Sequence, residues 1–309
     1  MKHAAGWLLR LGVSALALWL VFRQVHPAEV LKTLPALPFP ILGACLLLLG
    51  PNLFFQFMKW RTLLHSLPEP PSAGVIVRSL LLGILLGLVT PGRVGEHARV
   101  LVFTGVSRTR LAALSLLDRL ASSLVTVVAG MVCLLLLPSS GLPRPLGIGL
   151  YLVGGLSLLA HLGVAGLLID PARVLGFVSR WKRLADHPRW QAVNEGLAAV
   201  DAPRRAALVG WSWAFWTCFI LQFSLLVTGL GVFDARVPAA AGATFLVTSL
   251  VPISLGDLGL RELASGALFS TLGADPAKAV SASLLLFVIN VLLPALVAVP
   301  LLFRPRVQP

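Results

Sequence analysis

Long apolar segments separated by short polar stretches recur from one end of the chain to the other. Six of them are long enough to cross the roughly 30 Å of hydrocarbon in a bilayer as helices. The pattern therefore predicts an all-α integral membrane protein, organised as a single polytopic domain over residues 1–309. The six predicted spans are 8–22, 39–58, 111–137, 145–169, 206–230 and 279–303.

Four further apolar segments are shorter, and they occur as two adjacent pairs. Residues 74–90 and 97–106 form the first pair, and residues 239–251 and 259–272 form the second. Glycine, proline and charged residues separate the two members of each pair, and such residues break helices or are costly in lipid. Each pair therefore predicts a re-entrant helical hairpin, over 74–106 and 239–272, surrounded by protein or water. The predicted turn residues are Pro91, Gly92 and Gly95 in the first hairpin, and Pro252, Ser254, Gly256 and Gly259 in the second.

The positions of lysine and arginine predict the orientation. If the N-terminus is inside, 16 of the 25 basic residues fall on the inner side and 5 on the outer side. Lys59, Arg204 and Arg205 are counted here in inner loops. An excess of basic residues is typical of cytoplasmic loops, so both termini are expected in the cytoplasm, in the cytoplasmic (inner) membrane of the cell. The two hairpins then enter from opposite faces, which predicts an inverted repeat like that of many secondary transporters.

The longest polar stretch, residues 170–205, holds a further concentration of basic residues together with two tryptophans. This composition predicts interfacial helices on the cytoplasmic surface, where basic side chains meet anionic lipid. A plain positively charged loop is the alternative. At the N-terminus, no small-residue cleavage site follows the apolar segment 8–22, so it is expected to be a retained helix and not a signal peptide.

The composition fits a membrane protein and argues against several other classes. Hydrophobic residues make up 57% of the chain and charged residues only 12%, against about 25% charged in soluble domains. The net charge of +13 is distributed at the ends of apolar segments, so a nucleic-acid partner is not expected. The three cysteines lie inside apolar segments without CxxC spacing, so neither a metal nor another cofactor is expected.

Eight charged residues fall within or beside the predicted membrane region. Each would cost about 2.5–3.5 kcal/mol at a helix centre, so they must form pairs or line water. Asp118 and Arg119 are neighbours that point about 100° apart on a helix, so one of them can serve each hairpin. Glu96 is expected to be a buried partner of a nearby arginine. The basic members are Arg93, Arg99, Arg119 and Arg261, and the acidic members are Glu96, Asp118, Asp257 and Glu262.

The second arm of each hairpin predicts an anion site. Each arm begins near the membrane centre, where its free N–H groups and its positive dipole end are available. Together with Arg93 and Arg261, these helix ends can bind an anion, and Glu96 and Glu262 can cap them when the site is empty. His97 can relay protons or can be an ordinary hydrogen-bonded core residue. In the alternative interpretation, all these ion pairs only fix the hairpins in place.

Three stretches around these residues carry a family resemblance. Pro91-Gly-Arg-Val-Gly-Glu96-His-Ala-Arg99, Asp118-Arg119 and Pro252-Ile-Ser-Leu-Gly-Asp-Leu-Gly-Leu-Arg261-Glu262 resemble the lysylphosphatidylglycerol synthase transmembrane, flippase-like family, over roughly residues 8–303. The resemblance implies a multi-pass protein that moves lipids or lipid-linked precursors between leaflets. Some members carry an aminoacyl-transferase domain that makes the lipid, and this sequence does not show one. Ser122 stands where the family often has an acid, and Asp257 where it often has glycine.

Three functions are therefore considered. The first is a lipid flippase or transporter, not an enzyme, with a central polar cavity and with membrane lipids bearing anionic or phosphate headgroups as partners. The second is an intramembrane enzyme that transfers a lipid headgroup, with Glu96, His97, Asp118 and Glu262 as acid–base groups. The third is a non-transporting partner of a lipid-synthesis enzyme.

Overall fold

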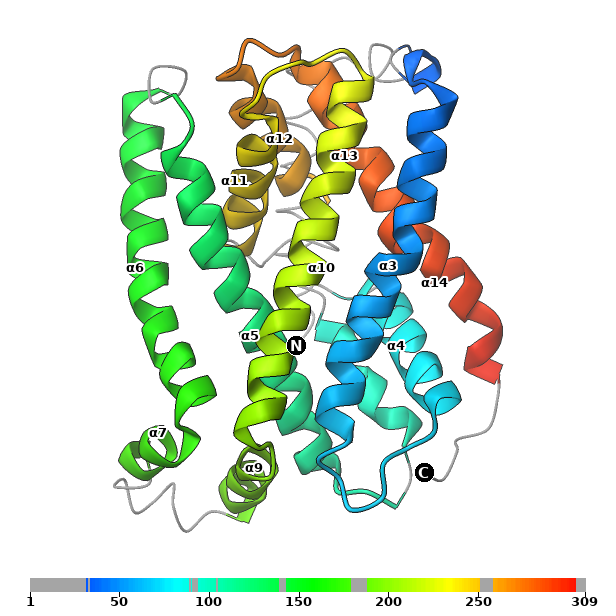
Figure 1. Ribbon diagram of the computed structural model, residues 1–309, viewed down its shortest axis with the longest axis vertical. Helices are drawn as coiled ribbons and strands as arrows, with labels where there is room; N and C mark the ends of the chain where they lie inside the picture. The colour runs from blue at the N-terminus through cyan, green and yellow to red at the C-terminus, as the bar shows by residue number, and fades with distance from the viewer. Residues whose placement is uncertain are drawn as a thin grey trace, which may run out of the picture.

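The computed structural model describes residues 34–88, 94–103, 105–138, 143–178, 188–250 and 258–303, together with Lys32 and Thr90. The regular elements of this part are helices, and most of them run along the long axis of the molecule (Figure 1). The predicted helix 8–22 and most of the predicted hairpin-turn residues lie outside the described residues.

Five helical runs of the described part are long and apolar enough to cross a membrane. They correspond to five of the six predicted spans, and the chain is a multi-pass membrane protein. Exposed apolar side chains cover the outer helix α6, as expected of a surface in contact with lipid. The five runs are α3 (Phe39–Leu64), α5 (Arg108–Leu135), α6 (Arg144–Ile169), α10 (Ala202–Gly229) and Pro276–Leu301.

The last of these runs is not a uniform α-helix. It consists of α13 (Pro276–Phe287), the π-helical turn η4 (Val288–Leu292), α14 (Leu293–Ala298) and the 3-10 turn η5 (Val299–Phe303). Pro294 has no N–H group to donate to the carbonyl of Asn290, four residues earlier. The regular hydrogen-bond ladder is therefore interrupted at this point, and the helix widens there.

Side-chain caps explain where several helices begin. Ser107, Asp201 and Asp275 each accept a hydrogen bond from a backbone N–H in the first turn of α5, α10 and α13, respectively. Because α10 begins at Ala202, Arg204 and Arg205 lie in its first turn. The helix therefore begins four residues before the predicted span 206–230, and the inner side of the membrane stays a prediction for both arginines.

Two pairs of short helices replace spans at opposite ends of the molecule (Figure 1). The first pair is α4 (Ala73–Leu88) with the 3-10 helix η2 (Val94–Val102), and the second is α11 (Val237–Leu250) with α12 (Leu260–Ser270). The members of each pair pack against each other. The 16 residues of α4 extend about 24 Å, less than the thickness of the hydrocarbon layer. The short lengths agree with the sequence pattern, although the second arm of the first pair is 3-10 and not α-helical.

Each pair has its own hydrophobic core. Trp60, Ile76 and Leu114 belong to the core around α4 and η2, whereas Phe223 and Phe269 belong to the core around α11 and α12. The long helix α5 contributes to both cores and connects them. The two ends of the molecule are thus packed separately, and the space between them is where polar residues can gather.

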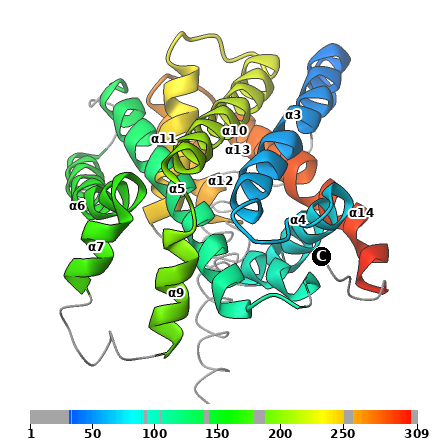
Figure 2. The same cartoon turned by 60° about the horizontal axis from the view of Figure 1, so that its bottom comes forward.

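The described part of the segment between α6 and α10 contains two short helices. These are α7 (Pro171–Val178) and α9 (Pro188–Ala198), and both lie across the end of the bundle where α4 and η2 are found (Figure 2). The short 3-10 turn η1 (Leu34–Ala36) precedes α3 at the opposite end. The polar stretch 170–205 therefore contains helices and is not simply a loop.

Candidate functional site

Glycines allow the two helices of the first short pair to pack closely. A Cβ atom added at Gly95 would lie 2.1 Å from the Leu86 carbonyl oxygen, and one at Gly87 would lie 2.7 Å from Cγ of Glu96. The Gly95 N–H donates to Thr90 Oγ1 at 2.6 Å, and the Thr90 hydroxyl donates to the Leu86 carbonyl at 2.7 Å. Gly95 therefore allows the close approach predicted for it, and η2 lies directly on α4.

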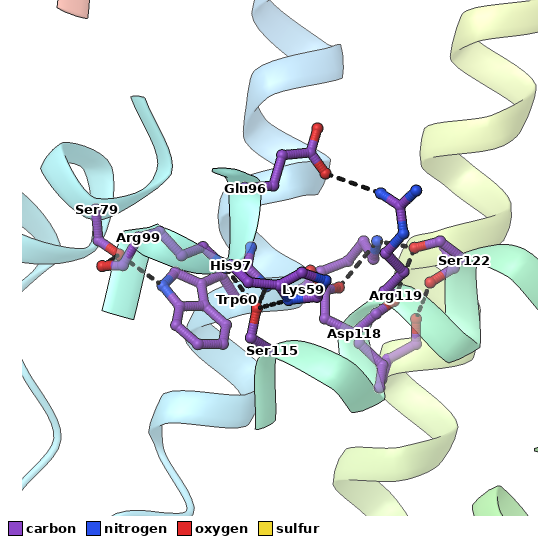
Figure 3. Close-up of polar contacts among 12 residues, drawn as sticks. Lys59, Trp60, Ser79, Glu96, His97, Arg99, Ser115, Asp118, Arg119 and Ser122 are labelled. Carbon is purple, nitrogen blue, oxygen red and sulfur yellow. Dashed lines mark hydrogen bonds and ion pairs between the residues drawn. The ribbon is translucent and has the colours of Figure 1, made fainter. Parts of the chain in front are cut away.

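An ion pair between η2 and α5 is the centre of the site. Arg99 Nη2 donates to Asp118 Oδ2 at 2.8 Å, and Lys59 Nζ lies 2.9 Å from Asp118 Oδ1 (Figure 3). The Lys59 ammonium also donates to Ser122 Oγ. One buried carboxylate thus faces two cations that come from different helices. Lys59 is inside α3 and only 5% exposed, so its assignment to a cytoplasmic loop was wrong.

Arg99 is fixed on all sides. Its guanidinium carbon lies 3.8 Å from the centre of the Trp60 ring, a cation–π contact. Trp60 Nε1 donates to Ser79 Oγ at 3.2 Å, and the Ser79 hydroxyl donates to the Arg99 carbonyl at 3.0 Å. The backbone and the side chain of Arg99 are therefore both anchored, and the residue forms a rigid part of the site.

Ser115 determines the protonation state of His97. Its Oγ accepts hydrogen bonds from Arg99 Nε at 3.3 Å and Nη2 at 3.2 Å, and it lies 2.9 Å from His97 Nδ1. A hydroxyl has two lone pairs and one proton, so with both lone pairs used it donates to Nδ1. His97 is therefore the neutral tautomer with its proton on Nε2.

A more open ion pair lies at the edge of the cluster. Arg119 Nη1 is 3.2 Å from Glu96 Oε2, and their side chains are 40% and 27% exposed. Glu96 thus has the arginine partner expected for it, but it is only partly buried. Among the contacts of the described residues, Asp118 and Arg119 both pair with η2, each through a different residue (Figure 3).

These residues line a cavity of about 360 Å³. Helices α3, α4, η2, α5, α10 and α11 contribute to it, so the two short pairs meet there from opposite ends. Three hydroxyl residues, Thr126, Thr248 and Ser249, extend the polar lining. We use the term cavity cluster for its charged and hydrogen-bonded members: Lys59, Glu96, His97, Arg99, Ser115, Asp118, Arg119 and Ser122.

A second group of buried polar residues lies at the start of α12, and we call it the closed cluster: Gly259, Arg261, Glu262 and Ser283. Glu262 Oε1 accepts from Arg261 Nη2 and from the Ser283 hydroxyl, both at 2.8 Å. Its Oε2 accepts from the Gly259 N–H at 2.7 Å, which is the capping predicted for this glutamate. Gly259 has a φ of +84°, as a turn glycine was expected to have.

The closed cluster is separate from the cavity. Arg261 is 4% exposed and Glu262 is fully buried, and neither belongs to the described lining of the cavity. Arg261 Nε donates to Ser283 Oγ at 2.9 Å, and its guanidinium faces the Phe287 ring. The sequence motif thus places these two residues in a hydrogen-bonded core between α12 and α13.

Seven of the sequence-predicted site residues lie outside the described residues: Pro91, Gly92, Arg93, Pro252, Ser254, Gly256 and Asp257. Of the predicted ionisable residues that are described, five meet at the cavity: Glu96, His97, Arg99, Asp118 and Arg119. Sequence reasoning missed Lys59, Trp60, Ser79 and Ser115. The only available signal was that Lys59 and Trp60 directly follow an apolar segment and can continue its helix.

The described residues contain no group of three or more His, Cys, Asp or Glu side chains that could hold a metal ion. The cavity cluster offers three cations beside two carboxylates, in an otherwise apolar bundle. Such groups can bind an anionic or zwitterionic headgroup by charge-assisted hydrogen bonds.

A comparison with curated proteins returned no match. A family profile, described as the lysylphosphatidylglycerol synthase TM region, matches residues 7–298. This range includes the long helices, both short pairs and both polar clusters. The match covers nearly the whole chain and agrees with the motifs around Glu96, Asp118 and Glu262, so the chain belongs to the lysylphosphatidylglycerol synthase TM region family, a group of membrane proteins with a role related to lipids.

Proposed function

We propose that the protein moves lipids between the two leaflets of a membrane. The polar headgroup enters the cavity while the acyl chains stay in the surrounding lipid. The observation that carries this proposal is the placement of five ionised side chains around a cavity of about 360 Å³ within a bundle of membrane-spanning helices. Ionisable residues at such depth are costly and commonly mark a transport pathway.

The open ion pair of Arg119 and Glu96 is the contact that a headgroup would meet first. Both side chains are partly exposed, and their contact of 3.2 Å is longer than the 2.8 Å contact between Arg99 and Asp118. Replacing Glu96 by a phosphate as the partner of Arg119 should cost less free energy than replacing the partners of the anchored Arg99. We therefore propose that the guanidinium of Arg119 receives the headgroup phosphate with its planar fork.

Arg119→Lys tests this proposal. Lysine keeps the charge and loses the bidentate fork, so we expect a folded protein that moves lipid about tenfold more slowly. Arg204→Lys is the matched control, because Arg204 is 38% exposed and also pairs with a carboxylate, that of Asp201. The measurement is transfer of labelled phospholipid between leaflets of liposomes that contain the purified protein. Equal rates for both variants and the parent would exclude this role of Arg119, and no transfer by the parent would exclude lipid movement.

The two other functions receive less support. Ser115 and His97 resemble a nucleophile–base pair, but Ser115 is 1% exposed and its oxygen already accepts two hydrogen bonds from Arg99. Both Asp118 oxygens face cations, so this carboxylate is a poor general base. A non-transporting partner of a lipid synthase has no need of a polar cavity. We therefore propose a function without catalysis.

We also propose that α4–η2 and α11–α12 are re-entrant hairpins of an inverted repeat in the cytoplasmic membrane, with both termini in the cytoplasm. Their short lengths, their separate cores and their positions at opposite ends support this arrangement (Figure 1). Cysteine introduced at Ser107 should react with an impermeant reagent only from the cytoplasmic side, and cysteine at Ala274 only from outside. Reaction of Ala274→Cys from the cytoplasmic side would contradict the inverted arrangement.

A further inference from the structure

Hydrogen bonds fix the direction of several hydroxyl groups in the cavity wall. Ser122, Thr248 and Ser249 donate to backbone carbonyls of their own helices, with oxygen–oxygen distances of 2.7–3.0 Å. A carbonyl oxygen only accepts, so these three hydroxyls have only lone pairs left for other partners. Ser123 also lines the cavity, but its partner is a side chain that can change its protonation state.

This partner is His161, which connects the neighbouring helices α5 and α6 (Figure 1). Its Nε2 lies 2.8 Å from Ser123 Oγ, and its Nδ1 lies 2.7 Å from the carbonyl oxygen of Ser157. Because that carbonyl accepts, Nδ1 carries a proton whether the ring is neutral or charged. In the neutral ring, Nε2 therefore accepts the hydroxyl proton of Ser123, and Ser123 has lone pairs left for a ligand.

Uptake of a proton by this pair reverses the Ser123 hydroxyl. A proton from water in the cavity binds to Ser123 Oγ, while the original hydroxyl proton passes to His161 Nε2. The ring is then an imidazolium that donates to Ser123, and the new hydroxyl proton is free to donate into the cavity. One proton is gained, and Ser123 changes from an acceptor to a donor for a ligand.

The charged form of His161 has little support from carboxylates. In α6 and in the four helices that pack against it, the one carboxylate is Asp118, which already faces two cations. A lone charge inside a membrane is costly, so the imidazolium is stabilised best when a headgroup oxygen accepts from Ser123. The charged residues of these helices are Arg144 on α6, Arg108, Arg110, Asp118 and Arg119 on α5, Arg173 on α7, and Arg204 and Arg205 on α10, whereas α11 has none.

The basic residue closest to Ser123 along α5 is Arg119, one turn earlier, and it faces Glu96. The other titratable side chains of these helices are neutral near pH 7, so they add no charge beside the ring. They are Tyr151 on α6, Cys133 on α5 and Cys218 on α10.

We propose that His161 is a proton-binding site and that Ser123 couples proton binding to headgroup binding in the cavity. This inference rests on the proposed function and adds regulation by protons to the same site. The proton and a headgroup oxygen each raise the affinity for the other by the same factor. Low pH should therefore favour both the binding and the transfer of lipid.

Substitutions at both residues of the pair test the coupling. His161→Gln removes the titratable ring and Ser123→Ala removes the hydroxyl, so both should abolish the pH dependence. Ser123→Thr keeps a hydroxyl at the same position and should keep the dependence. His65→Gln is the matched control, because His65 is a half-buried histidine outside the described cavity lining.

Transfer of labelled phosphatidylcholine is measured in liposomes with the same buffer on both sides, at about pH 8 and about pH 5.5, on either side of the ordinary histidine pKa of about 6.5. The phosphocholine headgroup does not titrate in this range. The parent, Ser123→Thr and His65→Gln should be about fivefold faster at the lower pH, the factor expected from one additional hydrogen bond. A parent with equal rates at both pH values, or a His161→Gln variant that keeps the fivefold difference, would overturn the inference and leave lipid movement itself intact.

Binding in detergent gives a second measurement that does not depend on transfer. By calorimetry, short-chain phosphatidylcholine should bind the parent about fivefold more tightly at the lower pH, and should bind His161→Gln equally at both. Nitrogen NMR of protein with labelled histidine should show His161 with its proton on Nδ1 at the higher pH, and an imidazolium at the lower pH with the lipid present. A ring that stays neutral there would overturn the proton site. If binding follows this pattern and the parent transfers no lipid, the coupling stands and lipid movement is excluded.

Discussion

The cavity cluster and the closed cluster both combine arginine with a carboxylate at the second helix of a short pair. They differ in how deeply the ion pair is buried. Each oxygen of Glu262 accepts at least one hydrogen bond, and the residue is fully buried. Glu96, by contrast, is 27% exposed and makes a longer contact with a half-exposed Arg119.

This difference shows that residue type alone does not identify a ligand site in a membrane protein. A carboxylate that caps its own helix and pairs with its sequence neighbour is satisfied by local structure, and a ligand gains little by displacing those partners. A carboxylate that pairs across two helices beside a cavity can exchange its partner. The closed cluster is thus suited to stabilising the second short pair, and the cavity cluster is suited to binding.

Glu262→Gln should have the largest effect on stability. The substitution leaves the Arg261 guanidinium, 4% exposed, without a counter-charge, which costs about 3–5 kcal/mol for a buried pair. Thermal unfolding of the purified protein in detergent measures this loss. Glu195→Gln, at an exposed position of α9, is the control and should change stability by about 0.5 kcal/mol or less. Similar stability of Glu262→Gln and the parent would show that water reaches the closed cluster.

Glu96→Gln should have a smaller effect on stability and a clear effect on lipid transfer. Its ion pair is partly exposed, so its loss should cost about 1 kcal/mol or less. The charge balance of the cavity changes, however, because the carboxylate that faces Arg119 is lost. Unfolding and transfer are measured on the same preparation. A destabilisation as large as that of Glu262→Gln would mean that the ion pairs of the two clusters are equally buried.

The exposed pair of Asp234 and Arg236, between α10 and α11, should have the smallest effect. Hydrogen bonds from the Arg236 side chain and backbone lower the pKa of Asp234 to about 2. This value is below the pKa of roughly 3.9 that an aspartate has in an unfolded chain. The pair therefore stabilises the fold fully above about pH 3.9, and its contribution is lost as the pH falls toward 2. Arg236→Gln should return the pKa of Asp234 toward about 3.9, measured by NMR titration. An unchanged pKa would show that the backbone alone lowers it.

The sequence was sufficient to predict the helical architecture because length and apolar character determine membrane spans directly. Segments 74–90 and 239–251 were recognised as short, and they are the short helices α4 and α11. The close packing of η2 on α4 could not be predicted in detail, since it needs Gly95 next to the Leu86 carbonyl, where a Cβ atom has no room.

The site could be predicted only in part. Charges inside apolar segments indicated Glu96, Arg99, Asp118 and Arg119, because such residues are rare in lipid. The role of Lys59 could not be predicted, because a lysine at the end of an apolar segment is also typical of a cytoplasmic loop. The burial of Glu262 depends on Ser283, which is 21 residues away on another helix, and no local pattern reports such a partner.

The glycines at the contact between α4 and η2 limit which substitutions the protein can tolerate. Gly87 and Gly95 carry no chemical group, yet any side chain at either position would push the two helices apart and move Glu96. In saturation mutagenesis, with cell growth or lipid transfer as the measurement, these two positions should therefore be among the least tolerant of substitution in the chain. The shape of the cavity therefore depends on the absence of a Cβ atom at these two positions as much as on the charges that line it.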